Sequence, residues 1–145
     1  MLYTSLTKKA LKLCFEAHKD QVDKTGLPYV FHPFHLAEQL EDEIAVTCAL
    51  LHDVVEDTDT TFEDLSNMGF PVEVLDVLKL LTHDPEVPYM EYVENIKSNS
   101  IAVQIKLQDL KHNSDLSRLD YVDDHAKARQ QKYLAAIELL QLENK

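Results

Sequence analysis

The chain has 145 residues and a formal net charge of −12, from 26 acidic and 14 basic residues, which disfavours DNA, RNA or an anionic membrane surface as a partner. Its length predicts a single domain over residues 1–145, and its two glycines argue against disorder or a β-rich fold. No apolar run approaches the ~20 residues that cross a bilayer, and the N-terminus lacks a signal-peptide pattern. We therefore expect a cytoplasmic protein whose Cys14 and Cys48 are buried free thiols.

Eight segments carry helical periodicity or helix-end signals. In chain order they are about 5–21, 33–41, 43–57, 60–69, 71–81, 88–98, 100–113 and 123–142. Thr4 or Ser5 can cap the first helix, and Thr60 with Glu63 makes a capping box for the fourth. Only the run 101–107 resembles a strand, and its apolar residues also fit a buried helix. The sequence predicts an all-α bundle of seven or eight helices.

An unusually acidic stretch follows the most apolar of these segments. After the run that ends at Leu51 come five charged or metal-capable side chains, His52, Asp53, Glu56, Asp57 and Asp59. A core-facing helix normally avoids such groups, because burying an unpaired charge is costly. No lysine between Lys24 and Lys79 compensates them, so a divalent cation is the simplest partner.

Two other segments offer further metal ligands. His32 directly precedes a proline, whose ring restricts the direction of the residue before it. Asp109 begins a helical face that continues with His112 and Asn113. Each fragment alone is more often a hydrogen-bonded core residue or a solvated helix end. Together with the His-Asp pair at 52–53, however, they form a mixed nitrogen and oxygen shell that suits Mn, Fe, Co or Zn better than Ca or Mg.

Three segments carry a resemblance to a known family. The stretches "TGLPYVFHPFHLA", "ALLHDVVEDTDTTFEDL" and "IKLQDLKHNSDLSRL" resemble the HD-domain phosphohydrolases. Among these they are most similar to the hydrolase domain of RelA/SpoT proteins and to the stand-alone small alarmone hydrolases, from about residue 18 to 119. The resemblance implies an all-α HD fold, a single Mn ion, and removal of the 3′-diphosphate from guanosine tetra- or pentaphosphate, the (p)ppGpp of the stringent response.

The resemblance also implies roles for individual residues. The metal ligands are His32, His52, Asp53 and Asp109, and the catalytic acidic pair is Glu56 and Asp57. The substrate contacts are Lys24, Thr25 and Asn113. No synthetase segment follows these motifs, so we expect a chain that hydrolyses the alarmone and does not make it.

The chain departs from the family pattern at three positions. Asp23 stands where a guanine-stacking arginine is expected, and Leu110 and Asp115 stand where arginines are common. We therefore expect relaxed base selectivity, because an acid cannot stack on a base as a guanidinium does. The basic residues near the motifs that could meet phosphate, or equally could be surface residues, are Lys24, Lys106, Lys111 and Arg118.

Two alternatives to (p)ppGpp hydrolysis stay open at this point. The chain could hydrolyse another nucleotide or a phosphorylated metabolite with the same metal chemistry. It could also be a catalytically idle HD module that binds a nucleotide, although retention of both Glu56 and Asp57 argues against this. The sequence indicates neither the oligomeric state nor which metal is loaded.

Overall fold

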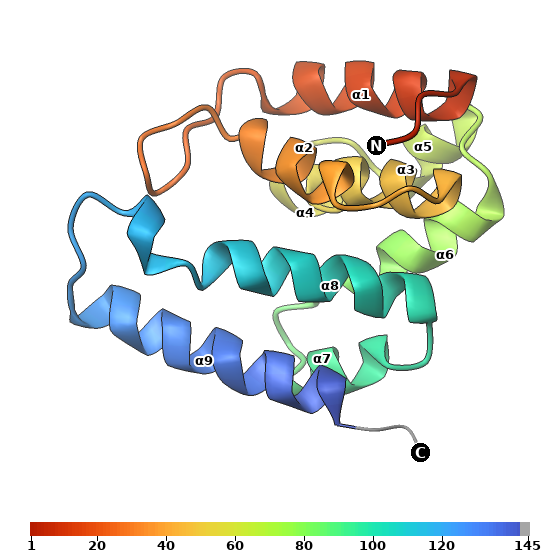
Figure 1. Cartoon of the computed structure of the whole chain (residues 1–145). Coiled ribbons are helices and arrows are strands. Elements are labelled where there is room, and N and C mark those ends of the chain that lie inside the picture. The colour runs from red at the N-terminus through yellow and green to blue at the C-terminus, as the bar shows by residue number, and fades with distance from the viewer. Residues whose placement is uncertain (143–145) are drawn as a thin grey trace.

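A computed structural model describes residues 1–142, which are helical apart from loops and one isolated bridge between Val22 and Pro28. The helices in chain order (Figure 1) are α1 (Ser5–His18), α2 (Phe31–Glu38), α3 (Glu43–Leu51), α4 (Val54–Asp57), α5 (Phe62–Asn67), α6 (Val72–Leu81), α7 (Tyr89–Ile96), α8 (Ser100–Asn113), the 3₁₀ turn η1 (Leu116–Arg118) and α9 (Asp124–Gln141). The all-α prediction is confirmed. Counting α3 and α4 as the one helix predicted, eight α-helices remain in this part of the chain.

Helix α3 forms the centre of the bundle. Every residue from Ala45 to Leu51 is buried, because α1, α2, α6 and α8 all pack against this helix. Figure 1 shows α3 beneath α1, with α8 and α9 stacked below it. A helix that is apolar all round can only be stable in such a position. The only polar side chain in this stretch, Thr47, donates its hydroxyl hydrogen bond to the Glu43 carbonyl at 2.8 Å.

Side-chain caps fix the helix ends, with one difference from the sequence prediction. Thr4 caps α1 as expected. The capping box of α5, however, is formed by Thr61 and Asp64 and not by Thr60 and Glu63. The Thr60 amide donates to the Thr58 hydroxyl at 3.2 Å, so Thr60 belongs to the preceding turn. The N-cap therefore lies one position later, at Thr61.

The segment predicted as one helix over 43–57 is two helices. The backbone of Asp53 has φ −106° and ψ 0°, outside the α region, and separates α3 from α4. The hydrophobic pattern runs on through Val54, which is buried, and therefore gives no sign of the break. In an unbroken helix the side chains of His52 and Asp53 would diverge by about 100°. The break instead lets them point toward one site.

Other features agree with the sequence, apart from shorter helices near the N-terminus. Helix α8 has the predicted bounds, so the run 101–107 is helix and not strand. Helices α1 and α2 each end about three residues earlier than expected. Cys14 and Cys48 are buried free thiols, as predicted. None of the helices within residues 1–142 combines the length and apolar character that a membrane crossing requires.

Candidate active site

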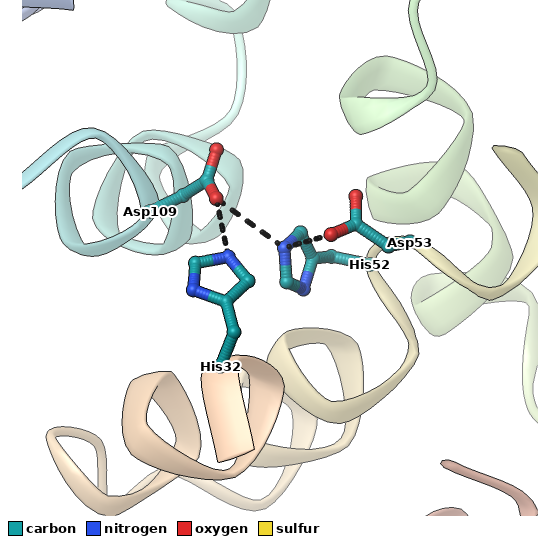
Figure 2. Close-up of side chains that lie close together, drawn as sticks. All are labelled: His32, His52, Asp53 and Asp109. Carbon is teal, nitrogen blue, oxygen red and sulfur yellow. Dashed lines mark hydrogen bonds and ion pairs between the residues drawn. The ribbon is translucent and has the colours of Figure 1, made fainter. Parts of the chain in front are cut away.

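Four side chains from three segments converge near the centre of the molecule (Figure 2). His32 comes from α2, His52 and Asp53 from the turn between α3 and α4, and Asp109 from α8. One potential ligand atom from each lies within 4.8 Å of all the others. The His32 Nε2 atom is 2.8 Å from Asp109 Oδ1, and His52 Nε2 is 3.0 Å from Asp53 Oδ2. The structure thus brings together all four side chains that the sequence predicts as metal ligands.

The protonation of His52 fits a metal ligand. Its Nδ1 atom lies 2.7 Å from the Ala49 carbonyl, to which it can only donate, so the neutral ring carries its lone pair on Nε2. That buried Nε2 has no hydrogen-bond partner within residues 1–142, although it faces carboxylate oxygens of Asp53 and Asp109. Three electron-pair donors that face one another need a cation between them. Ligands bound at about 2.1 Å would lie on the order of 3–4 Å apart, as these atoms do.

A second imidazole layer supports His32. The Nδ1 atoms of His32 and His112 are 2.7 Å apart, and the His112 ring stacks on His32 and on His35. Burial and the neighbouring His32 lower the pKa of His112 to about 3, so His112 is neutral and can accept the hydrogen bond. The His32 ring is then oriented with Nε2 toward Asp109, which is the usual arrangement of a second partner behind a metal-binding histidine.

The charges in the cluster favour a cation at its centre. Burial would raise the pKa of Asp109, but the ammonium group of Lys106 and the nearby imidazoles of His32 and His52 outweigh it and hold that pKa well below its usual range. Burial would lower the pKa of His52, but the carboxylates of Asp53 and Asp109 raise it well above its usual value. The same field that attracts a proton to this point attracts a metal ion.

Two side chains orient the carboxylates. The Tyr29 hydroxyl donates a hydrogen bond to Asp53 Oδ2, and the Asn113 amide donates to Asp109 Oδ1 at 3.0 Å. Sequence reasoning missed Tyr29, although its place three residues before His32, at the start of the same turn, could have suggested it. Asn113 is where the sequence predicts it, one helical turn from Asp109.

The acidic pair lies beside the cluster, in two different environments. Glu56 Oε1 accepts a hydrogen bond from the backbone amide of His83 at 2.8 Å. Partial burial, with the carboxylates of Asp53 and Glu56 nearby, raises the pKa of Asp57 to about 6. Asp57 is therefore the member of the pair that can exchange a proton near neutral pH.

Two hollows of about 300 Å³ each open at the site and share a border formed by Lys24, Tyr29, Asn113 and Tyr133. The first lies over the loop after α1 and contains Thr25 and apolar side chains, among them Val22 and Leu116. The second is lined by His52, Asp53 and Asp109 of the four-residue metal-ligand cluster, by the acidic pair, and by three tyrosines and two lysines from α7, α8 and α9. Two hollows side by side, the first with both apolar and charged side chains and the second mostly polar, can hold the two ends of a nucleotide.

Comparisons with known proteins agree with this geometry. No family model matches the chain. Guanosine-3′,5′-bis(diphosphate) 3′-pyrophosphohydrolase MESH1 of Danio rerio is 36% identical over 96 residues, 61% of this chain and 53% of that protein. The Mus musculus protein of the same name is 35% identical over 120 residues, 72% of this chain and 66% of that protein.

A solved structure of a metazoan ortholog of SpoT, described as hydrolyzing ppGpp, has a TM-score of 0.79 and 26% identity, and covers 97% of this chain and 88% of that one. The chain belongs to the HD-domain (p)ppGpp hydrolase family. The chain matches about half the length of the Danio rerio relative.

The departures of this HD-domain hydrolase from the family pattern have structural explanations. Leu110 is fully buried in the core, so its side chain does not face the site. Asp115 caps η1, where its carboxylate accepts from the Ser117 amide at 3.0 Å. Asp23 Oδ1 accepts from the amide and hydroxyl of Thr25 and from the Leu27 amide, at 2.5 to 3.1 Å. Asp23 and Asp115 thus order the walls of the first hollow.

The four basic residues that the sequence suggests as phosphate contacts lie in different environments. Lys106 is turned inward, with Nζ 2.8 Å from Asp109 Oδ2, while Lys111 on the same helix is exposed. Arg118 donates to the His112 carbonyl at 2.7 Å and pairs with Asp23, so its guanidinium is already occupied. Lys24 lines both hollows. Lys24, Lys106 and Arg118 therefore line the hollows, and Lys111 does not.

Proposed function

We propose that the chain is a metal-dependent hydrolase that removes the 3′-diphosphate of guanosine tetra- or pentaphosphate. The observation that carries the proposal is the convergence of His32, His52, Asp53 and Asp109 beside an acid whose pKa is raised to about 6, where two hollows meet. The names of the relatives describe this activity for those proteins.

The four clustered side chains would hold one divalent cation. Their mixed nitrogen and oxygen shell suits Mn, Fe, Co or Zn, and the family resemblance favours Mn among these. When bound, the cation supplies Lewis-acid chemistry that lowers the pKa of a water and polarises a phosphate oxygen. Tyr29 and Asn113 keep two of the ligand carboxylates in position through their hydrogen bonds. His112 does the same for His32.

The chain's own acids move the proton in the proposed reaction. Water attacks the phosphorus that is bonded to the 3′-oxygen, and Asp57 accepts the proton that the water loses. The bond between that phosphorus and the 3′-oxygen breaks, the oxygen takes up a proton, and pyrophosphate leaves. Glu56, held by the His83 amide, lies beside Asp57 and would orient the water.

The nucleoside would occupy the first hollow. Lys24, Thr25 and Asn113 lie along it and would contact the ribose and its phosphates. Asp23 supplies no base-stacking group there, because its carboxylate is bound by the loop, so selectivity for guanine is expected to be weak. The cytoplasmic location expected from the sequence suits a nucleotide substrate and stays a prediction.

A release assay tests the proposal. Purified protein is stripped of metal, reloaded with Mn, and incubated with guanosine and adenosine 3′-diphosphate nucleotides, 3′-monophosphates and other phosphorylated metabolites. We expect pyrophosphate from the 3′-diphosphates, none after chelation, and none from the Asp53→Ala variant. Release of phosphate from other metabolites alone would favour the alternative of a hydrolase for another phosphorylated metabolite. Nucleotide binding without release, from protein shown to contain metal, would favour an idle HD module.

A further inference from the structure

The second hollow continues away from the metal-ligand cluster along three side chains from three helices. Lys106 on α8 lies next to Asp109, and its Nζ is 5.9 Å from the centre of the Tyr89 ring of α7. The Nζ of Lys132 on α9 is 4.3 Å from the centre of the same ring. Helix α9 packs against both α7 and α8 (Figure 1), and these groups line the same hollow as three of the cluster residues. We call them the path from the cluster to Lys132.

Lys106 on this path is paired with Asp109, but Tyr89 and Lys132 lack hydrogen-bond or ion-pair partners among the residues that the structure describes. The Tyr89 hydroxyl is buried and has no hydrogen-bond partner there. Burying a donor in this way costs free energy unless something accepts its hydrogen bond. Lys132 forms no ion pair with any acid within residues 1–142, although the whole chain carries 26 acidic residues.

Positive charge also accumulates at this end of the site. Burial lowers the pKa of Lys24, and so does repulsion from Arg129 and Lys132. Cations grouped in this way attract an anion. This end of the hollow can therefore bind negative charge in addition to the phosphate held at the metal cluster.

We propose that Tyr89, Lys106 and Lys132 bind the distal phosphate of the 3′-diphosphate, and so make the site selective for a diphosphate over a monophosphate. The assignment rests on the proposed function, since it places the proximal phosphorus at the cluster and the nucleoside in the first hollow. Lys106 and Lys132 line the same hollow as the cluster and offer the distal phosphate its positive charge. The Tyr89 hydroxyl donates to it, and the two ammonium groups neutralise it.

Binding of the product tests this assignment without requiring turnover. Calorimetry measures the affinity of the Mn-loaded protein for inorganic pyrophosphate and for inorganic phosphate. The variants are Lys132→Gln and Tyr89→Phe, with Lys127→Gln as a matched control on the exposed face of α9 and Tyr121→Phe as a control for an exposed hydroxyl. We expect each test variant to bind pyrophosphate about tenfold more weakly, the scale of one charge-assisted hydrogen bond, with phosphate affinity changed less than about twofold. The controls should match the wild type.

Three results would overturn the assignment. They are a wild type that does not bind pyrophosphate, test variants that bind it as the wild type does, and variants that lose pyrophosphate and phosphate affinity equally. Failure of the proposed function looks different. In that case pyrophosphate affinity would still depend on Tyr89 and Lys132, but no nucleoside 3′-diphosphate would be hydrolysed. If hydrolysis occurs, KM for a 3′-diphosphate should rise about tenfold in Lys132→Gln while kcat changes little.

Discussion

The carboxylate of Asp23 and the guanidinium of Arg118 approach to 3.4 Å and join two segments that lie 95 residues apart in the chain. The loop after α1 and the turn η1 are thereby held together as opposite walls of the first hollow. Asp23 also accepts three hydrogen bonds within its own loop. The acid at position 23 therefore stabilises the loop and its contact with Arg118, a role that the sequence pattern alone does not reveal.

The first prediction concerns Asp23. Asp23→Ala should destabilise the protein by about 1–2 kcal/mol, because two loop amides and a hydroxyl lose their acceptor. Arg118→Ala should cost less, about 0.5–1 kcal/mol, since it removes a partly exposed ion pair and one hydrogen bond to the His112 carbonyl but leaves the three loop bonds intact. Asp23→Arg should raise KM, because an arginine there would repel Arg118. Urea unfolding and steady-state kinetics measure both effects. A lower KM in Asp23→Arg would show that base stacking outweighs loop order.

The second prediction concerns the metal. Four ligand side chains from three segments join α2, α3 and α8, so a bound ion should stabilise the fold by mass action. Mn at about 100 times its dissociation constant should raise Tm by about 5–10 °C over the chelated protein. Differential scanning calorimetry of chelated and reloaded samples measures the difference. An unchanged Tm, on protein shown to have bound and lost metal, would refute a structural role for the ion.

The third prediction separates ligands from the acidic pair. Asp53→Ala should lose metal and activity together. Glu56→Ala should retain metal while kcat falls by roughly 10²–10⁴, the usual scale of a positioned acid–base group. Glu56→Gln is the matched control, since its amide oxygen can still accept from the His83 amide. Metal analysis and kinetics are measured on the same preparations, and metal loss in Glu56→Gln would place Glu56 in the ligand shell.

The sequence predicts the fold class and brings the four cluster residues into view because each lies in a local pattern. His32 precedes a proline, His52 and Asp53 end an apolar run, and Asp109 begins a polar helical face. Each of these patterns involves residues only a few positions apart, so it can be recognised within one segment of the sequence. The break at Asp53 escapes the same reasoning, because the apolar pattern continues across it into Val54.

Tyr29 and Lys132 were missed because their contacts cross long sequence separations. The Tyr29 hydroxyl reaches Asp53, and Lys132 on α9 lies over Tyr89 on α7. Only the packing of α9 against α7 and α8 brings those two together. One weak signal existed in the sequence. Arg129, Lys132 and Tyr133 share a helical face, but such a stripe is also typical of an ordinary solvated surface.

The last prediction uses the ionisation of Asp57. Its pKa of about 6 in the folded protein lies above the ordinary aspartate value of 3.8, through partial burial and the nearby carboxylates of Asp53 and Glu56. As pH rises from about 4 to about 6, the unfolded chain releases this proton before the folded chain does, so the folded state loses stability. Above about pH 6 both states are ionised and the loss stays constant. The penalty is thus fully present at neutral pH and absent below about pH 4.

Asp57→Asn removes that penalty and should therefore stabilise the metal-free protein at pH 7.5. We expect Tm to rise by roughly 2–4 °C, a modest value because solvent screens a partly exposed group. The gain should vanish near pH 4 and shrink when Mn is added, because a cation at the cluster already offsets the repulsion from Asp53. Asp59→Asn, the same charge change at a nearby exposed acid, is the control and should shift Tm less. Activity of Asp57→Asn should fall even as stability rises, because the proton acceptor is lost. A variant that is less stable than the wild type at pH 7.5, or equally stabilised at pH 4, would show that Asp57 is not repelled by the ligand carboxylates.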